Sequence, residues 1–230
     1  MSDNEITLTI DGKSVTVPKG TKVVDAAKQV NVDIPVFCYH EKIGPLGCCR
    51  MCLVEVEKMP KLMTACTMDV MPDMVVKTTT DKVEKAQKGV LEFTLLNHPL
   101  DCPVCDKGGE CPLQDNTFKF GPPDTRMEFH RHNNAKATPL SPVITIDRER
   151  CIACQRCTAY SERIEQDRGL VMLNRGFHNE VGTFNNEPYD TRFSGNVIDI
   201  CPVGALTNTD FRFKARTWDL SNAETLCANC

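Results

Sequence analysis

The cysteines are the side chains in this sequence that most clearly could do chemistry. There are 14 of them among 230 residues, and most stand in short clusters. The chain begins with no secretory signal, so we expect a reducing compartment, in which a disulfide framework is improbable. Thiols that stay reduced and clustered are suited to binding iron or zinc. The cysteine pattern therefore predicts a metal-binding protein.

The first cluster has the spacing C-x10-C-x2-C-x13-C and consists of Cys38, Cys49, Cys52 and Cys66. Two cysteines two residues apart can reach one site from a single loop, and four thiolates suit a 2Fe-2S cluster. A four-cysteine zinc site is the alternative, although such sites usually pair two close cysteine knuckles and only one is present here. Cys48 directly precedes Cys49, so the spacing leaves open which of the two is the ligand.

The second cluster follows the pattern H-x3-C-x2-C-x5-C and consists of His98, Cys102, Cys105 and Cys111. Three cysteines leave one iron of a 4Fe-4S cluster without a protein ligand. An imidazole nitrogen can ligate iron, which makes His98 the nearest candidate. Asp101 as the ligand, with His98 supporting the site from outside, remains open at this point.

The third cluster gives the strongest signal. Cys151, Cys154 and Cys157 have the spacing C-x2-C-x2-C, and a remote Cys201 is followed by Pro202. Bacterial ferredoxins bind a 4Fe-4S cluster with this arrangement. Because no second C-x2-C-x2-C run is present, we expect one cluster here.

The ligands add up to three clusters. Eleven cysteines and His98 supply twelve ligands for one 2Fe-2S and two 4Fe-4S clusters. Cys48, Cys227 and Cys230 are left over. We assign no cluster to the Cys227-x2-Cys230 pair, and a thiol-based redox enzyme acting through it is an alternative of another class.

Local patterns indicate the elements that must position the first cluster. Residues 6–10 alternate apolar and polar side chains, Asp11-Gly12 supplies a tight turn, and Val15 and Val17 resume the alternation, which predicts a hairpin. We expect Thr21 to cap a helix with an apolar face. A further strand is expected at residues 53–56, giving a small α+β domain.

A second helix is expected ahead of the histidine. The run from Asp81 to Glu84 resembles a capping box, and apolar residues at helical spacing continue to Leu95. His98-Pro99 should stop this helix and deliver His98 to the cysteine loop. The prolines and glycine near residues 121–123 indicate an extended linker, after which a new module begins at Val143.

Composition excludes several classes of function. A net charge of -4 argues against a nucleic-acid-binding protein. No apolar run approaches the ~18 residues that a membrane span needs. The sequence contains neither a G-x-G-x-x-G dinucleotide fingerprint nor a G-x-x-x-x-G-K-[ST] phosphate loop. We therefore expect any nucleotide-dependent chemistry coupled to this chain to lie in another subunit.

Taken in order, these motifs resemble the large iron-sulfur subunit of NADH:quinone oxidoreductase (complex I). The resemblance covers nearly the whole chain, including the Arg175–His178 run and the Cys201 stretch. In the family's Gly-x-Cys-Arg-x-Cys run a small residue precedes the ligand, which implies Cys49 as the ligand and makes Cys48 a departure. The family's histidine-ligated 4Fe-4S site has the same pattern as the second cluster, which implies His98 as its fourth ligand.

The resemblance implies an α+β fold in successive modules. These are a β-grasp 2Fe-2S ferredoxin-like domain, a helical segment with the 4Fe-4S site of one histidine and three cysteines, and a small ferredoxin-like 4Fe-4S domain. The expected bounds are 1–79 for the 2Fe-2S domain, 80–120 for the histidine-containing segment, 121–142 for a linker, 143–220 for the second 4Fe-4S domain, and 221–230 for the start of an incomplete molybdopterin-oxidoreductase-type 4Fe-4S motif.

The function implied is electron transfer rather than complete catalysis. Such a subunit of NADH dehydrogenase passes electrons from a flavin- and NADH-binding subunit toward quinone, through downstream iron-sulfur or quinone-reducing subunits. We expect it in the cytoplasm, peripheral to the inner face of the cell membrane, with membrane contact only through partners. Similar modules in NAD-linked hydrogenases and formate dehydrogenases give the alternative function. A zinc-stapled interaction module is a further alternative, and it would leave the protein colourless.

Overall fold

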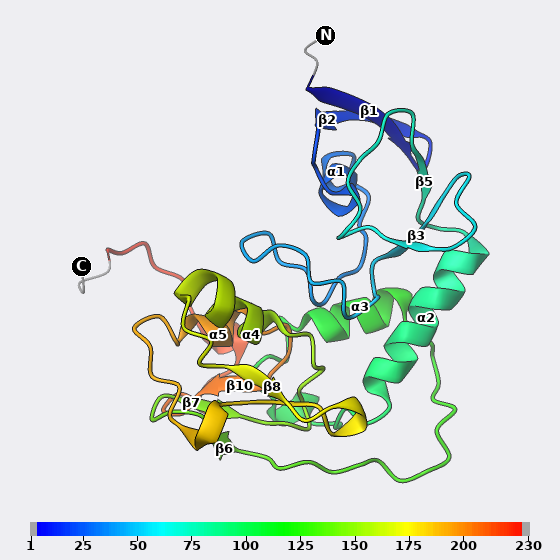
Figure 1. Cartoon of the computed structure of the whole chain (residues 1–230). Helices are drawn as coiled ribbons and strands as arrows, with labels where there is room; N and C mark the ends of the chain where they lie inside the picture. Colours follow the sequence, from blue (N-terminus) through cyan, green and yellow to red (C-terminus); the bar gives the residue numbers. More distant parts are fainter. Residues whose placement is uncertain (1–3, 227–230) are drawn as a thin grey trace.

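The computed structural model describes residues 4–226 and arranges them in three neighbouring parts (Figure 1). A strand-rich part contains the N-terminal residues, two helices form the middle, and a small mixed module contains the C-terminal residues. Cys227 and Cys230 lie outside the described residues.

The N-terminal part is built on a five-stranded mixed sheet with the order β2-β1-β5-β3-β4. The first two strands form the predicted hairpin, with Ile6 opposite Val17 and Leu8 opposite Val15 on the buried face. The other neighbour of β1 is the parallel strand β5, which places two distant segments side by side. The strands are β1 Glu5–Ile10, β2 Lys13–Pro18, β3 Leu53–Val56, β4 Met63–Thr64 and β5 Val75–Lys77.

The hairpin turn needs a left-handed backbone at both central residues, with φ of 47° at Asp11 and 80° at Gly12. Aspartate and glycine are the residues that tolerate this geometry best. The Asp11 carboxylate also accepts a hydrogen bond of 2.7 Å from the Thr78 backbone N–H, just beyond β5. The turn therefore fixes both the hairpin and the return of the chain to the sheet.

Helix α1 (Val23–Gln29) buries Val23, Val24, Ala26 and Ala27 against this sheet. The prediction that Thr21 caps it was wrong, because Lys22 occupies the cap position and no side chain makes a cap hydrogen bond. The Thr21 hydroxyl instead donates to the Pro18 carbonyl at 2.7 Å and stabilises the turn that precedes the helix.

The middle part consists of α2 (Asp81–Leu95) and α3 (Pro112–Phe120), with a short 3-10 turn, η1 (Cys102–Val104), between them. The helix before His98 was predicted correctly, but its cap lies one residue earlier. The Thr80 hydroxyl accepts a hydrogen bond from the Val83 N–H at 3.4 Å, so Asp81 is the first helical residue. Asp81 there still favours the helix, because negative charge complements the N-terminal dipole.

Residues 121–137 contain no helix or strand and run along the outside of α2. Arg126 pairs with Glu92 of α2, and the Arg131 guanidinium donates to the His98 carbonyl. Strand pairing resumes at β6 (Thr138–Pro139), inside the segment expected to be linker. The segment is therefore attached to the helix that precedes the histidine.

The C-terminal module combines a three-stranded sheet, order β10-β7-β6, with a two-stranded ribbon and two short helices. Helix α4 begins inside the third cysteine cluster and continues into a π-helical turn, while α5 ends just before Cys201. The remaining elements are β7 Ile144–Ile146, α4 Arg156–Tyr160, η2 Ser161–Glu165, β8 Val171–Leu173, η3 Gly176–His178, β9 Glu180–Gly182, η4 Phe184–Asn186, α5 Asn196–Ile200, β10 Leu206–Asn208 and η5 Thr217–Asp219.

One apolar core joins the three parts. It contains Phe37 from the N-terminal part, Leu91 and Leu113 from the middle helices, and Ile144 and Val203 from the C-terminal module. The N-terminal sheet has a second core of its own around α1. Within residues 4–226, no helix is both long enough and apolar enough to cross a membrane.

Leu91 tests how far stability depends on the shared core. Its side chain is 0% exposed, whereas Phe93 on the same helix is 77% exposed. Leu91→Ala should cost roughly 2–5 kcal/mol, as is usual for a truncated core leucine. Thermal unfolding followed by circular dichroism should show a midpoint at least about 4 °C lower. Phe93→Ala is the control and should be near wild type; equal midpoints in the two variants would contradict the packing described.

Candidate metal centres

The first cysteine cluster is gathered from three loops of the N-terminal part. Cys38 follows α1, Cys49 and Cys52 precede β3, and Cys66 follows β4. Hydrogen bonds from the Cys48, Cys49 and Cys66 thiols lower the pKa of the Cys38 thiol, so these three sulfurs lie within bonding reach of Cys38. A hydrogen bond with Cys66 likewise lowers the pKa of the Cys52 thiol. The structure thus brings all four expected ligands to one buried place.

Cys48 and Cys49 differ in what they face. Cys49 is partly buried, and its sulfur accepts the Cys38 backbone N–H at 3.4 Å. Backbone N–H bonds to sulfur are typical of iron-sulfur ligands. The exposed Cys48 instead donates its thiol to the Cys154 carbonyl at 3.3 Å. Cys48 thus lies between the first and the third group, close to both the Cys38 sulfur and the Cys154 carbonyl, whereas the Cys49 sulfur has the backbone N–H contact expected of a ligand.

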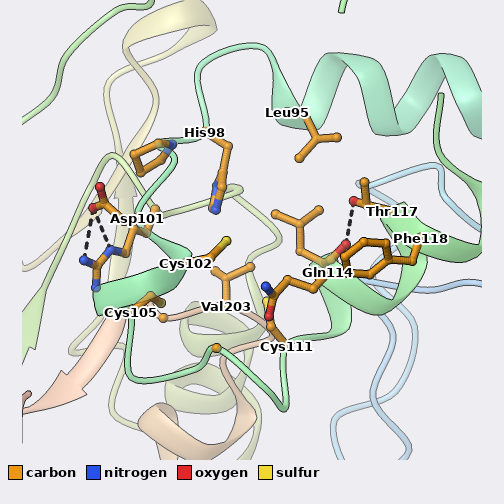
Figure 2. Close-up of a pocket in the computed structure, with 15 residues that line it drawn as sticks. Leu95, His98, Asp101, Cys102, Cys105, Cys111, Gln114, Thr117, Phe118 and Val203 are labelled. Atoms are coloured by element: carbon orange, nitrogen blue, oxygen red, sulfur yellow. Dashed lines mark hydrogen bonds and ion pairs between the residues drawn. The ribbon is translucent and has the colours of Figure 1, made fainter. Parts of the chain in front are cut away.

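The second cluster lines a cavity of about 180 Å³ between α2, α3 and the C-terminal module (Figure 2). His98, Cys102, Cys105 and Cys111 face it, and so does Leu95 at the end of α2. The cavity brings together the four side chains that the sequence grouped. Its remaining lining is mainly apolar, which suits a buried redox centre.

His98 is set up as a neutral donor. Burial, with a smaller contribution from the charge of Arg150, lowers the pKa of His98 to about 4. The imidazole is therefore uncharged at neutral pH, as a metal ligand must be. Its buried Nδ1 has no hydrogen-bond partner among residues 4–226. A buried polar atom without a partner is costly, and a metal ion facing it would remove that cost.

Asp101 is poorly suited to replace His98. One oxygen of its carboxylate accepts hydrogen bonds from the Arg150 guanidinium at 3.0 and 3.1 Å and lies 2.7 Å from the Lys136 ammonium. Figure 2 shows these bonds to the guanidinium. The pKa of Asp101 is lowered mainly by Lys136. The carboxylate is thus committed to an ion-pair network that borders the site.

Gly204 allows the C-terminal module to approach this cavity. A Cβ added to Gly204 would lie 2.1 Å from the Cys105 sulfur, far closer than two non-bonded atoms can approach. Only glycine lets the backbone pass so close to a thiol. A cavity, three thiols, a neutral imidazole and this close backbone approach together fit the ligand set of a 4Fe-4S cluster.

The third cluster is built from the loop before α4 and the end of α5. Positive φ at Ala153 and Gln155 winds the loop, and the Ala153 N–H donates to the Cys151 sulfur at 3.4 Å. Cys201 arrives from more than forty positions away in the sequence. All four cysteines line a cavity of about 20 Å³, much smaller than the one beside His98; they are Cys151, Cys154, Cys157 and Cys201.

Burial dominates the chemistry of these thiols. It raises the pKa of the Cys151 thiol to about 11 and shifts those of Cys154 and Cys157 in the same direction. A metal must therefore displace protons when it binds here.

Within residues 4–226, no three His, Cys, Asp or Glu side chains surround a point suited to a single ion. An iron-sulfur cluster divides its ligands among several irons, so its thiols need not meet at a point.

The spatial order of the three groups differs from their order in the sequence. The first group adjoins the third through the Cys48–Cys154 bond. The third adjoins the second because the Cys111 thiol donates to the Pro202 carbonyl at 3.8 Å, directly after Cys201. The third group thus lies between the other two. Sequence reasoning missed this order, as well as Gly204 and the buried Arg156, because no local spacing records such contacts.

Family models match three successive segments of the chain. Residues 3–81 match a 2Fe-2S iron-sulfur cluster binding domain, and residues 87–126 match an NADH-ubiquinone oxidoreductase-G iron-sulfur binding region. Residues 141–207 match the ferredoxin-like domain of NADH-quinone oxidoreductase subunit 3. The chain therefore has a mixed α/β fold with a 2Fe-2S ferredoxin-like domain and 4Fe-4S binding regions.

Curated relatives agree over almost the entire chain. The G subunit of the NADH-quinone oxidoreductase of Streptomyces coelicolor is 48% identical over 227 residues, which cover 98% of this chain and 27% of that protein. Subunit 3 of the Thermus thermophilus enzyme is 42% identical over 255 residues, covering 96% of this chain and 32% of that one. The chain thus spans about 30% of the length of these relatives.

A solved structure shares the fold. A chain of an NAD+-reducing NiFe-hydrogenase in the H2-reduced state superposes with a TM-score of 0.80 and 26% identity, covering 91% of this chain and 90% of that chain. The two curated relatives are much more similar in sequence than this hydrogenase chain, and both are NADH-quinone oxidoreductase subunits. Over nearly its whole length the protein is therefore homologous to part of the large iron-sulfur (G) subunits of NADH-quinone oxidoreductase.

Proposed function

We propose that this chain is an electron-carrying iron-sulfur unit of an NADH:quinone oxidoreductase. In this role it conducts electrons from a flavin- and NADH-binding subunit toward quinone and contains no complete active site. Partner subunits supply the remaining chemistry and any membrane contact. The assignment rests on the family and on the arrangement of the three ligand groups.

The ligand groups are assigned to one 2Fe-2S and two 4Fe-4S clusters. Bound clusters of this kind accept and release single electrons. The proposed ligands are Cys38, Cys49, Cys52 and Cys66 for the 2Fe-2S cluster, His98, Cys102, Cys105 and Cys111 for one 4Fe-4S cluster, and Cys151, Cys154, Cys157 and Cys201 for the other.

The proposed modules keep the bounds 1–79, 80–120, 143–220 and 221–230, with a linker at 121–142. The topology of the N-terminal sheet and α1 supports a β-grasp domain.

The observation that carries this proposal is the direct contact between the loops that hold neighbouring ligand groups. Cys48 touches the backbone of Cys154, and Cys111 touches the backbone next to Cys201. Electron tunnelling weakens steeply with distance, so a carrier needs its centres held close together. The chain meets this need because residues from all three groups pack in one shared core.

The hydrogenase neighbour supports a second candidate. A chain of an NAD+-reducing NiFe-hydrogenase shares the fold of this chain, with a TM-score of 0.80 and 26% identity. An iron-sulfur subunit of a soluble NAD-linked hydrogenase would use the same ligand groups. Co-purification with a quinone-reducing partner or with a nickel-iron partner would distinguish the two.

Metal content tests the electron-carrier assignment directly. Anaerobically purified protein should contain about ten iron and ten acid-labile sulfide atoms per chain, the sum of one 2Fe-2S and two 4Fe-4S clusters. Low-temperature EPR after dithionite reduction should show one 2Fe-type and two 4Fe-type signals. Stoichiometric zinc without sulfide would instead support a zinc-stapled protein and overturn the proposal.

His98 is tested by substitution with alanine. Removing the imidazole leaves one iron of the second site without its ligand, so a single 4Fe-type EPR signal should be lost or altered. The other two signals should remain. His130→Ala is the matched control, because His130 is exposed on the segment beside α2. Three unchanged signals in His98→Ala would rule out His98 as a ligand.

Gly204 gives an independent test of the same site. Gly204→Ala places a methyl group against the Cys105 sulfur, so the second site should lose most of its iron while the 2Fe-type signal persists. Gly195→Ala in the same module is the control, since an added Cβ there meets no atom within 4 Å. Iron analysis and EPR report both variants; full iron content in Gly204→Ala would show that the close approach is unimportant.

A further inference from the structure

Arg156 is a buried charge that none of the ligand assignments uses. It stands between Cys154 and Cys157 at the start of α4, and it is only 9% exposed. Arginine is rarely buried in proteins unless it is paired. Among the described residues, no carboxylate lies within ion-pair distance of its guanidinium, and its Nε has no hydrogen-bond partner.

The contacts of Arg156 lead to two different ligand groups. One terminal nitrogen donates to the Tyr39 carbonyl at 2.6 Å, and the other donates to the Ile200 carbonyl at 3.3 Å. Tyr39 directly follows Cys38 of the first group, and Ile200 directly precedes Cys201 of the third. A single guanidinium therefore lies in the boundary between these two groups.

The side chains that face this charge are cysteines of both groups. Arg156 lines the same cavity as Cys154, Cys157 and Cys201 of the third group. Burial lowers the pKa of Arg156, while Cys154 and Cys201 of the third group and Cys38 and Cys49 of the first act in the opposite direction. A buried cation is tolerated only where negative charge compensates it, and clusters bound by cysteine thiolates at the two proposed sites would supply that charge.

We propose that the single positive charge of Arg156 raises the reduction potentials of both the first and the third cluster. The inference rests on the proposed function, because it requires clusters at those sites. Adding an electron makes a cluster more negative, so a fixed cation nearby in a weakly polarisable interior favours the reduced form. The same charge acts on both sites, since its guanidinium lies in the boundary between them.

Arg163 offers a matched comparison. It crosses the same boundary and donates to the Ile43 carbonyl at 2.9 Å and to the Pro45 carbonyl at 3.3 Å, but it is exposed. Its charge is screened by solvent, whereas that of Arg156 is buried among thiols. Comparing variants of the two arginines therefore distinguishes the loss of a contact between the modules from the loss of electrostatic control of the clusters.

The experiment is a potentiometric titration followed by EPR on the whole protein, after iron and sulfide analysis has established that wild type contains its clusters. Arg156→Gln and Arg156→Met remove the charge, and buried ionic groups are often replaced by methionine without loss of folding. Both variants should lower the potentials of the 2Fe-2S cluster and of the 4Fe-4S cluster at Cys151–Cys201. Arg156→Lys keeps the charge, so both potentials should stay near the wild-type values. Arg163→Gln should leave both potentials unchanged.

The outcomes are distinct. Unchanged potentials in a cluster-containing neutral variant, or a shift in only one of the two, would overturn the shared role of Arg156 and leave the electron-carrier function standing. Failure of both neutral variants to assemble, with wild-type potentials in Arg156→Lys, would make Arg156 a folding residue and equally overturn the inference. Wild-type protein without iron and sulfide would refute the proposed function itself.

Discussion

The structure depends on one constraint, which is that the cysteines proposed as ligands are themselves part of the hydrophobic core. Cys38, Cys111, Cys154, Cys157 and Cys201 pack in the same apolar cluster as the residues that join the three parts of the chain. A thiol buried in this way is hard to ionise, as the raised pKa of Cys151 illustrates. Metal binding and core packing are therefore not separable here, because the same atoms serve both.

Buried charged side chains lie beside this core, next to the proposed cluster sites. Arg150, 3% exposed, is held by Asp101 and by the 1% exposed Asp147, and the network supports the loop that presents His98. Arg156 has no carboxylate partner among the described residues and instead lines the cavity of the third cysteine group. The two arginines thus have different surroundings: one completes a network beside a neutral ligand, while the other faces the thiols directly.

The segment from Cys201 to Gly204 connects two of the sites. Cys201 belongs to the third group, the Pro202 carbonyl accepts the Cys111 thiol, and Gly204 lies against Cys105 of the second group. Four consecutive residues therefore contact both proposed 4Fe-4S sites. This explains how a remote cysteine followed by proline can complete one site and at the same time form a wall of the next.

The sequence by itself determined the local features and the chemistry. It grouped the cysteines and His98 into three candidate sites and predicted the β1–β2 hairpin and the helix before His98, because short-range spacing and periodicity are sufficient for these. It failed at Thr21 and placed the cap at Asp81 instead of Thr80, since several polar residues near a helix start can cap it and tertiary packing selects one. Only the tertiary structure decided that the third group lies between the first and the second, that Gly204 must lack a side chain, and that Arg156 is shared. These features depend on contacts between residues about a hundred positions apart, such as Cys48 with Cys154, and no local pattern encodes contacts across that distance.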